Sequence, residues 1–261
     1  MMRKAALTVL TTLLLPACAW AAPALPKDPL GSPMWTYHAA RLFKGAPVVF
    51  DPRVRLQVPM IAENQHQFPV TVDARTIAGA SRIIVFADLN PLTQAVDFRP
   101  LHAAPFLSLR IKLDQRTPVR AAVLGADGAW HVSGVWVDAA GGGCSAPPVS
   151  RAKGDWALHL GEMRGSAWKE GDDLRLRVSI RHPMDTGLVE NIPSFHIETI
   201  HLRDAAGVEL ASMTVEGSVS EDPAFTFLLR PTREGPVKVQ ARDSEGREYQ
   251  GVIGPQSRPH G

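Results

Sequence analysis

The chain has 261 residues, of which 45% are hydrophobic and 21% charged, and its formal net charge is +2 at pH 7. This length suits one large or two small domains, and the apolar share is sufficient to build real cores. The weak charge, the scattered Lys and Arg residues and the 7% aromatic content give no indication of a nucleic-acid partner.

The N-terminus carries a predicted targeting segment. Arg3 and Lys4 precede a short apolar run at 5–15, and the tripeptide AWA at 19–21 fits the small-x-small pattern that signal peptidase cleaves. We therefore predict a signal peptide over residues 1–22 and export to a bacterial periplasm. No later run approaches the roughly 20 apolar residues of a membrane helix, so no integral membrane segment is expected after cleavage.

The two cysteines have different predicted fates. Cys18 lies in the signal peptide and is removed with it; in an alternative interpretation, LPAC at 15–18 is a lipoprotein box and Cys18 carries a lipid anchor. Cleavage leaves the mature chain with Cys144 alone. Structural disulfides need pairs, so a lone thiol in an oxidising compartment is buried and inert, paired to another molecule, or reactive.

Residues 28–44 place apolar side chains at spacings of three and four, which predicts a short helix that Gly45 and Pro47 end. After it, short segments of alternating or continuous apolar residues lie between turn residues, which predicts strands. These segments are 53–58, 68–72, 83–86, 107–113, 119–123, 130–132, 135–137, 174–180, 197–202, 208–215, 225–229 and 237–241. We expect an all-β fold of two immunoglobulin-like β-sandwich domains, with a short N-terminal helix before the first.

The run AAGGGCSAPP at 139–148 is the sharpest shift in composition. Its glycines supply flexibility and its prolines stiffen the exit, so it cannot contribute to a core. We predict a first sandwich over 28–143 that ends in a glycine-rich arm of Gly141, Gly142 and Gly143. A linker over 144–154 and a second sandwich over 155–256 follow.

Cys144 stands at the end of this arm, and we expect its thiol to be exposed and mobile. The five residues before it, fully extended, span roughly 17 Å at about 3.3–3.6 Å each, enough to carry a bound group into another protein. A thiolate is the nucleophile in such attachments. We predict that Cys144 attaches cargo; the plainer alternative is a linker cysteine without a role. A sulfur sealed inside a hydrophobic core would contradict the carrier interpretation.

Other chemistry is not indicated. His196 and His201 are five residues apart on a predicted strand and therefore face opposite sides, so they cannot share a metal ion. The sequence contains neither the Gly-x-Ser-x-Gly motif of hydrolases nor the Gly-x-x-x-x-Gly-Lys loop that binds phosphate. The glycines at 141–143 do not open a helix, so they do not form a dinucleotide-binding motif. We predict no catalytic residue, no cofactor, no metal site and no enzymatic activity.

Several runs are family-specific. The first half contains VPMIAEN at 58–64, PVTVD at 69–73, NP at 90–91, LRIK at 109–112 and GGC at 142–144. The second half contains IRHPMDTG at 180–187, IPSFHI at 192–197 and DPAFTF at 222–227. By these runs the first half resembles SoxY, the sulfur-carrier subunit of the bacterial thiosulfate-oxidising system, and the second half resembles its partner SoxZ.

Two departures from SoxY concern the thiol. In SoxY the arm ends the chain and two glycines follow the cysteine, whereas here SAPP at 145–148 follows and the chain continues. The thiol is therefore expected on a tethered loop with a shorter reach. This arrangement is more similar to the fused SoxYZ-like carriers associated with quinoprotein (PQQ-dependent) dehydrogenases.

The resemblance implies a periplasmic carrier that holds a sulfur-containing intermediate on Cys144 through an S–S bond. It would present this cargo to sulfur-oxidising enzymes or to a PQQ-dependent dehydrogenase. The resemblance also implies that the two halves pair within the chain. The alternative is a non-covalent adaptor for an exported PQQ-dependent dehydrogenase, in which the thiol is incidental.

Overall fold

The computed structural model describes residues 24–149, 151 and 154–256. The predicted signal peptide, Cys18 and part of the predicted linker lie outside the described residues. Helix α1 (Trp35–Phe43) falls within the predicted helical segment. None of the helices in the described part of the chain has the length and apolar character needed to cross a bilayer.

Fifteen strands follow α1 in the described residues, and they confirm the all-β prediction. The first half contains β1 (Val48–Phe50), β2 (Arg55–Gln57), β3 (Phe68–Asp73), β4 (Arg82–Ala87), β5 (Gln94–Pro100), β6 (Ala103–Ile111), β7 (Thr117–Leu124) and β8 (Trp130–Val137). After the short 3-10 helix η1 (Trp156–Leu158), the second half contains β9 (Met163–Glu170), β10 (Asp173–Ile180), β11 (Ile197–Arg203), β12 (Glu209–Val215), β13 (Ala224–Leu229), β14 (Val237–Asp243) and β15 (Glu248–Ile253).

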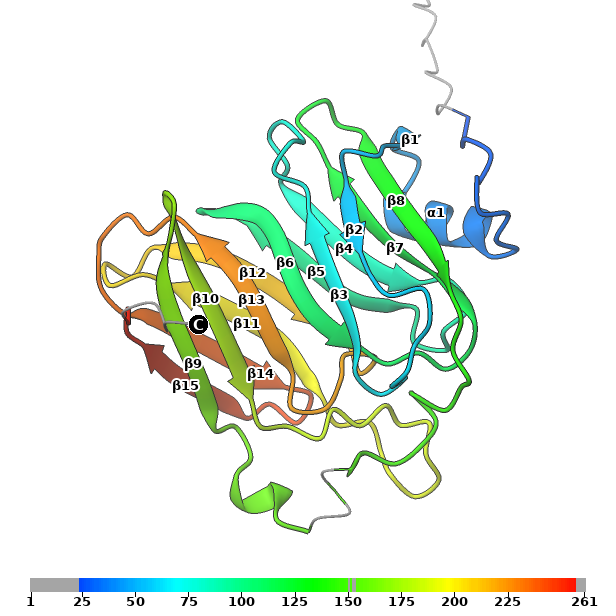
Figure 1. The fold of residues 1–261 in the computed structure, drawn as a ribbon. Helices are drawn as coiled ribbons and strands as arrows, with labels where there is room; N and C mark the ends of the chain where they lie inside the picture. The colour runs from blue at the N-terminus through cyan, green and yellow to red at the C-terminus, as the bar shows by residue number, and fades with distance from the viewer. Residues whose placement is uncertain (1–23, 150, 152–153, 257–261) are drawn as a thin grey trace, which may run out of the picture.

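The strands form two sheets, and each sheet contains strands from both halves. One sheet has nine strands in the order β1-β8-β7-β4-β5-β12-β11-β14-β15, and the other has six in the order β2-β3-β6-β13-β10-β9. The halves join where β5 pairs with β12 and where β6 pairs with β13, both antiparallel. Figure 1 shows the two sheets as layers, with the early strands on one side and the late strands on the other.

The core lies between the sheets and is continuous across the halves. One cluster of buried apolar side chains runs from Val54 in the first half to Ile253 in the second. Strand β4 shows why its sequence is apolar throughout: Ile83 and Val85 face this core, whereas Ile84 and Phe86 pack beneath α1 on the outer face. A strand covered on both faces needs no polar positions.

The two predicted sandwiches are therefore joined by hydrogen-bonded strands, and not only by a linker. Pairing within one chain was implied by the family resemblance, but its form was not visible in the sequence. Because β6 and β13 are neighbours, residues from both halves meet on the outer face of the six-stranded sheet and at the ends of these strands.

Candidate functional site

Cys144 lies at the boundary between the two halves, and its sulfur is buried. The residue is 1% exposed and is a free cysteine. The expectation that the thiol is held in the open is therefore wrong for this structure. The physical reason is that the chain continues into the second half after Cys144, so both ends of the glycine-rich segment are held against the protein.

The predicted arm of Gly141, Gly142 and Gly143 is docked rather than extended. Gly141 and Gly142 have φ values of 110° and 84°, a region that L side chains rarely adopt. A Cβ on Gly143 would lie 2.4 Å from the carbonyl oxygens of both Gln65 and Leu113. The glycines thus allow a tight turn and a close approach of the backbone to Gln65 and Leu113.

The first half holds the segment through hydrogen bonds to backbone and carboxylate. The Gly143 amide donates to the Leu113 carbonyl at 3.1 Å. Asp114 Oδ1 accepts from the amides of Cys144 at 3.0 Å and Ser145 at 3.1 Å, and from Ser145 Oγ at 3.0 Å. The Gln65 side-chain amide donates to the Gly141 carbonyl at 2.8 Å. One carboxylate therefore fixes the backbone on both sides of the thiol.

The second half contributes a contact from the other side. Thr186 Oγ1 donates a 2.7 Å hydrogen bond to the Cys144 carbonyl. Nearby, Lys112 Nζ of the first half donates to the carbonyls of Met184 and Gly217, the latter at 3.0 Å. The thiol segment is thus enclosed by side chains from both halves, and neither half alone could form this site.

The immediate surroundings of the sulfur are polar. The Lys112 carbonyl and Asn90 Nδ2 each lie 3.9 Å from Sγ, and Asn90 Nδ2 also donates to that carbonyl at 2.7 Å. None of the three hydrophobic clusters formed by the described residues includes Cys144, and the next residue, Ser145, is exposed. The sulfur is thus fully covered, with polar atoms of Asn90 and Lys112 beside it, and the exposed part of the chain begins at the next residue.

Burial controls the ionisation of this site. It raises the pKa of the Cys144 thiol to about 12, because a thiolate loses its hydration there; the Lys112 ammonium opposes this rise and the Asp114 carboxylate adds to it. Burial also lowers the pKa of Lys112 to about 8, although the Cys144, Asp185 and Glu221 charges act in the opposite direction. At neutral pH the enclosed thiol is protonated and therefore a poor nucleophile.

The histidines that the sequence analysis considered have separate partners and do not share a metal site. His196 Nδ1 lies 3.1 Å from Ser194 Oγ, and His201 Nδ1 lies 2.5 Å from Glu209 Oε1. Among the described residues, no group of three or more His, Cys, Asp or Glu side chains could hold a metal ion.

Sequence reasoning missed the residues that enclose the thiol, but a signal for most of them was present. Asn90, Lys112 and Thr186 each lie within a run on which the family resemblance depends. Asp114 lies outside those runs, and its contacts depend on the path of the segment after β8. Alternation could not identify Lys112 as buried, because it occupies an otherwise polar position next to β6.

Two family models match the chain in succession. The first, described as sulfur oxidation protein SoxY, matches residues 39–144, and the second, described as sulphur oxidation protein SoxZ, matches residues 163–253. The chain is a SoxY–SoxZ fusion. In this fusion Cys144 is the last residue of the SoxY match, and Thr186, which binds its carbonyl, belongs to the SoxZ match.

Other comparisons add little to this assignment. No curated protein matches the fusion. The sulfur carrier protein SoxY from Chlorobium limicola f thiosulfatophilum is 25% identical, over 41% of this chain and 96% of that chain, with a TM-score of 0.37. A beta-glycosidase from Bacteroides vulgatus is 10% identical, over 80% of this chain and 24% of that chain, with a TM-score of 0.25. Because these TM-scores are low, the assignment depends on the two family matches.

The assignment confirms the predicted order of SoxY before SoxZ. It also agrees with the predicted class, since SoxY and SoxZ are carrier and adaptor proteins rather than catalysts. The fusion is a carrier of sulfur oxidation, and the two halves pair within the chain.

Proposed function

We propose that this SoxY–SoxZ fusion is a periplasmic carrier that holds a sulfur-containing intermediate on Cys144. The observation that carries the proposal is the position of Cys144: it ends the SoxY match, and its backbone is held between the two halves by hydrogen bonds to Asp114 and Thr186. The N-terminal pattern of residues 1–22 supports export.

Loading requires the segment to open, because the enclosed thiol is protonated and out of reach. We assign roughly 0.5–1.5 kcal/mol to the neutral hydrogen bond of Thr186 and about 1.5–3 kcal/mol to the Asp114 carboxylate as one group, because water replaces its bonds when the segment opens. Contacts of that strength correspond to an open state populated at roughly 0.1–3%. The glycines of the arm give the opened segment the freedom to present the thiol.

The chemistry of attachment sets a requirement for the partner. Joining the Cys144 sulfur to the outer sulfur of thiosulfate forms an S–S bond, releases the thiol proton and gives up two electrons. A partner enzyme must accept those electrons, since the described residues hold no disulfide or metal centre that could do so. The proposed partners are sulfur-oxidising enzymes or a PQQ-dependent dehydrogenase.

Mass spectrometry of protein purified from its native host tests this function. We expect a fraction of the chains to carry an added mass on the peptide containing Cys144, and we expect reductant to remove that mass. Cys144→Ser should abolish both the adduct and growth of the host on a sulfur compound such as thiosulfate. An unmodified Cys144 under all growth conditions, together with a neutral Cys144→Ser phenotype, would contradict the proposal.

Burial of the thiol also favours a second candidate, a non-covalent adaptor for an exported PQQ-dependent dehydrogenase. In that case the thiol has no chemical role and only fills space between the two halves. Cys144→Ala places a small apolar side chain at this position and separates the two functions. An adaptor would keep full activity with its partner enzyme in the native host, whereas a carrier would lose it.

A further inference from the structure

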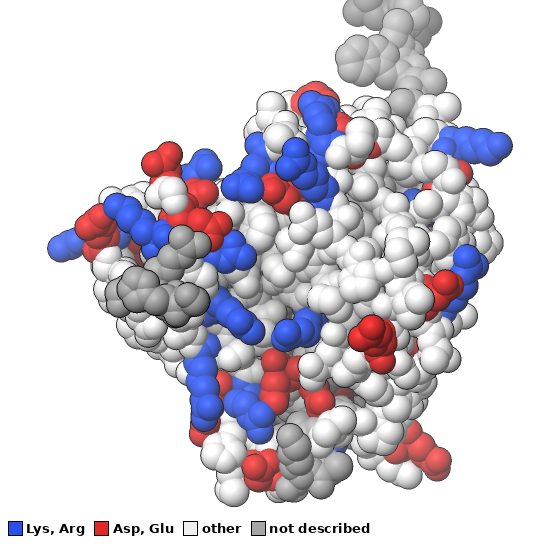
Figure 2. Space-filling view, viewed as in Figure 1, with Lys and Arg blue, Asp and Glu red and all other residues white. Residues whose placement is uncertain are grey.

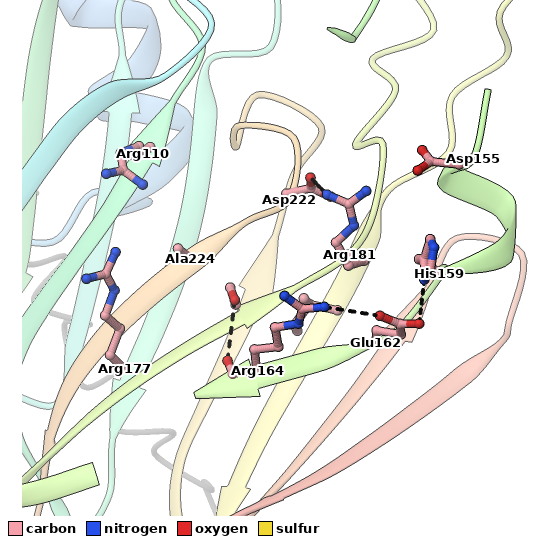
Figure 3. A pocket seen from close by; sticks show the side chains of 11 residues that line it. Arg110, Asp155, His159, Glu162, Arg164, Arg177, Arg181, Asp222 and Ala224 are labelled. Carbon is pink, nitrogen blue, oxygen red and sulfur yellow. Dashed lines mark hydrogen bonds and ion pairs between the residues drawn. The ribbon is translucent and has the colours of Figure 1, made fainter. Parts of the chain in front are cut away.

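The outer face of the six-stranded sheet carries a group of arginines where the two halves meet. Two neighbouring hollows, of about 510 and 390 Å³, lie on this face and share Arg110, Arg177 and Ala224. Figure 2 shows Lys and Arg side chains gathered over β9, β10 and the neighbouring part of β6, and Figure 3 shows the larger hollow from close by.

Three arginines of this group are paired with carboxylates. Arg164 lies 4.0 Å from Glu162, Arg175 lies 3.0 Å from Glu170, and Arg181 is paired with Asp222. Arg110 and Arg177 are exposed, and no carboxylate in the described part of the chain lies within ion-pair distance of either. Two arginines on this face therefore have no ion-pair partner in the described part of the chain, although the exposed Asp155 also lines the larger hollow.

The register of the strands explains why these two side chains are close. Ser108 on β6 pairs with Thr226 on β13, which pairs with Arg177 on β10. Arg110 lies two residues beyond Ser108 and therefore on the same face. The small side chain of Ala224 leaves the space between the two guanidinium groups open, as Figure 3 shows.

This pair of arginines exists only because the halves share a sheet. Arg110 belongs to the SoxY match and Arg177 to the SoxZ match. Arg110 is also two residues before Lys112, whose carbonyl lies 3.9 Å from Cys144 Sγ. A molecule bound at Arg110 and Arg177 would thus contact the strand whose continuation at Lys112 covers the thiol.

We infer that this face docks an acidic surface segment of a protein partner, with Arg110 and Arg177 as the anchoring cations. Guanidinium groups bind carboxylates through paired hydrogen bonds, which gives both attraction and geometry. The two shallow, continuous hollows are more extended than one small oxyanion requires, and this favours a chain segment with several carboxylates. The inference goes beyond the proposed carrier function, because binding at this face does not need the thiol.

A fluorescently labelled poly-L-glutamate peptide of about 15 residues is a suitable probe, titrated with the mature full chain at low ionic strength, where surface charges are least screened. We expect saturable binding that weakens with added NaCl. Arg110→Gln and Arg177→Gln should each weaken it about threefold to tenfold, and the double variant more than 20-fold, because each removes one anchoring cation. Arg177→Lys should retain part of the affinity, since it keeps the charge but loses the planar fork.

Arg99→Gln provides the matched control. Arg99 is an exposed arginine on β5 of the other sheet, and no ion pair is formed by it with the described carboxylates. Its replacement changes the net charge by the same amount and should alter the affinity by less than twofold. An equal loss in Arg99→Gln would show diffuse attraction to the whole molecule and overturn the inference, as would absent binding of the peptide to the wild-type chain.

Competition with the bound peptide distinguishes this docking face from a site for a small oxyanion. Sodium thiosulfate and sodium sulfate are compared with NaCl at equal ionic strength. Displacement of the peptide by thiosulfate at submillimolar concentration, dependent on Arg110 and Arg177, would also overturn the inference. The same titration with Cys144→Ser separates this inference from the carrier function: peptide binding should remain unchanged there, whatever the fate of the thiol.

Discussion

The two halves of this fusion meet in two different ways. In the sheets they are joined by the β5–β12 and β6–β13 ladders and by apolar packing, in which the rings of Phe98 and Phe227 lie 5.6 Å apart. Around Cys144 they are joined by individual polar contacts, those of Thr186 with the Cys144 carbonyl and of Lys112 with the carbonyls of Met184 and Gly217. Asp114 holds the same segment from within the first half. The first junction is built on fully buried side chains such as Phe98 and Phe227, whereas the second consists of polar groups next to the exposed Ser145.

This difference indicates which junction can open. Separating the ladders would expose large apolar side chains and many backbone groups at once, which costs far more than the net stability of a domain allows in a native fluctuation. Releasing the Cys144 segment exchanges a few hydrogen bonds for hydrogen bonds to water. The sheets therefore form a permanent scaffold, and the thiol segment is the part that we expect to move.

Weakening the sheet junction should have the largest effect. Phe227 is 1% exposed, so Phe227→Ala should lower the free energy of unfolding by about 3–5 kcal/mol, because it leaves a cavity between the halves. Urea denaturation followed by tryptophan fluorescence measures this. Val252→Ala, at a position that is 66% exposed, is the control and should change stability by less than about 0.5 kcal/mol. A loss below 1 kcal/mol in Phe227→Ala would show that the halves are held elsewhere.

Weakening the polar junction should change thiol access without a comparable loss of stability. Asp114→Ala removes the hydrogen bonds to the amides of Cys144 and Ser145 and to Ser145 Oγ, and this carboxylate as one group contributes about 2 kcal/mol to the closed position. We expect the reaction of Cys144 with a disulfide reagent such as DTNB to accelerate about thirtyfold. Asp138→Ala removes a carboxylate that pairs with Arg116 on the open surface, and it serves as the control with an unchanged rate.

The pH dependence of the thiol reaction should show the closed state directly. The pKa of the enclosed thiol, about 12, exceeds the ordinary value, so the closed position is fully favoured below about pH 8.5 and is lost as the pH rises toward 12. Lys112, with its pKa near 8, is then largely neutral and cannot hold the thiolate in place.

An accessible thiol stops gaining reactivity above about pH 9, because it is then ionised. For the fusion we expect a further rise of about tenfold in the alkylation rate from pH 9 to pH 10, since deprotonation also draws the segment open. A peptide with the sequence GGGCSA, measured under the same conditions, provides the reference. Identical profiles for peptide and protein would mean that the thiol is not enclosed in solution.

The contact from the second half should have the smallest effect. Thr186→Val keeps the shape of the side chain but removes the hydrogen bond to the Cys144 carbonyl, with a cost to the closed position of about 1 kcal/mol. The DTNB rate should rise about fivefold. Thr214→Val, at an exposed position on β12, is the matched control. An unchanged rate in Thr186→Val would place the restraint on Cys144 entirely within the first half.

The helix and most strands were accessible to sequence reasoning because their signals are local, but β1, β5, β9 and β15 have no counterpart among the predicted segments. Alternation at 107–113 located β6, and the continuous apolar run at 83–86 indicated a strand covered on both faces, as β4 is. The predicted strand at 53–58 was too long, because β2 covers only Arg55–Gln57. The glycine-rich run was predicted as a flexible arm with an exposed thiol; its docked position depends on Gln65, Leu113 and Asp114, which lie far from it in sequence.

The sequence by itself determined the all-β class, the helix before the first strand, the SoxY-then-SoxZ order and the choice of Cys144 as the residue of interest. Periodicity and short motifs carry that information, because each depends only on neighbouring residues. Tertiary structure decided which polar side chains are covered. Arg110 and Lys112 are two residues apart on or next to the same strand, yet Arg110 is exposed and Lys112 is buried by Met184 and Gly217 of the other half. The burial of the thiol and the closeness of Arg110 to Arg177 have the same cause, because both arise where strands that are distant in sequence become neighbours.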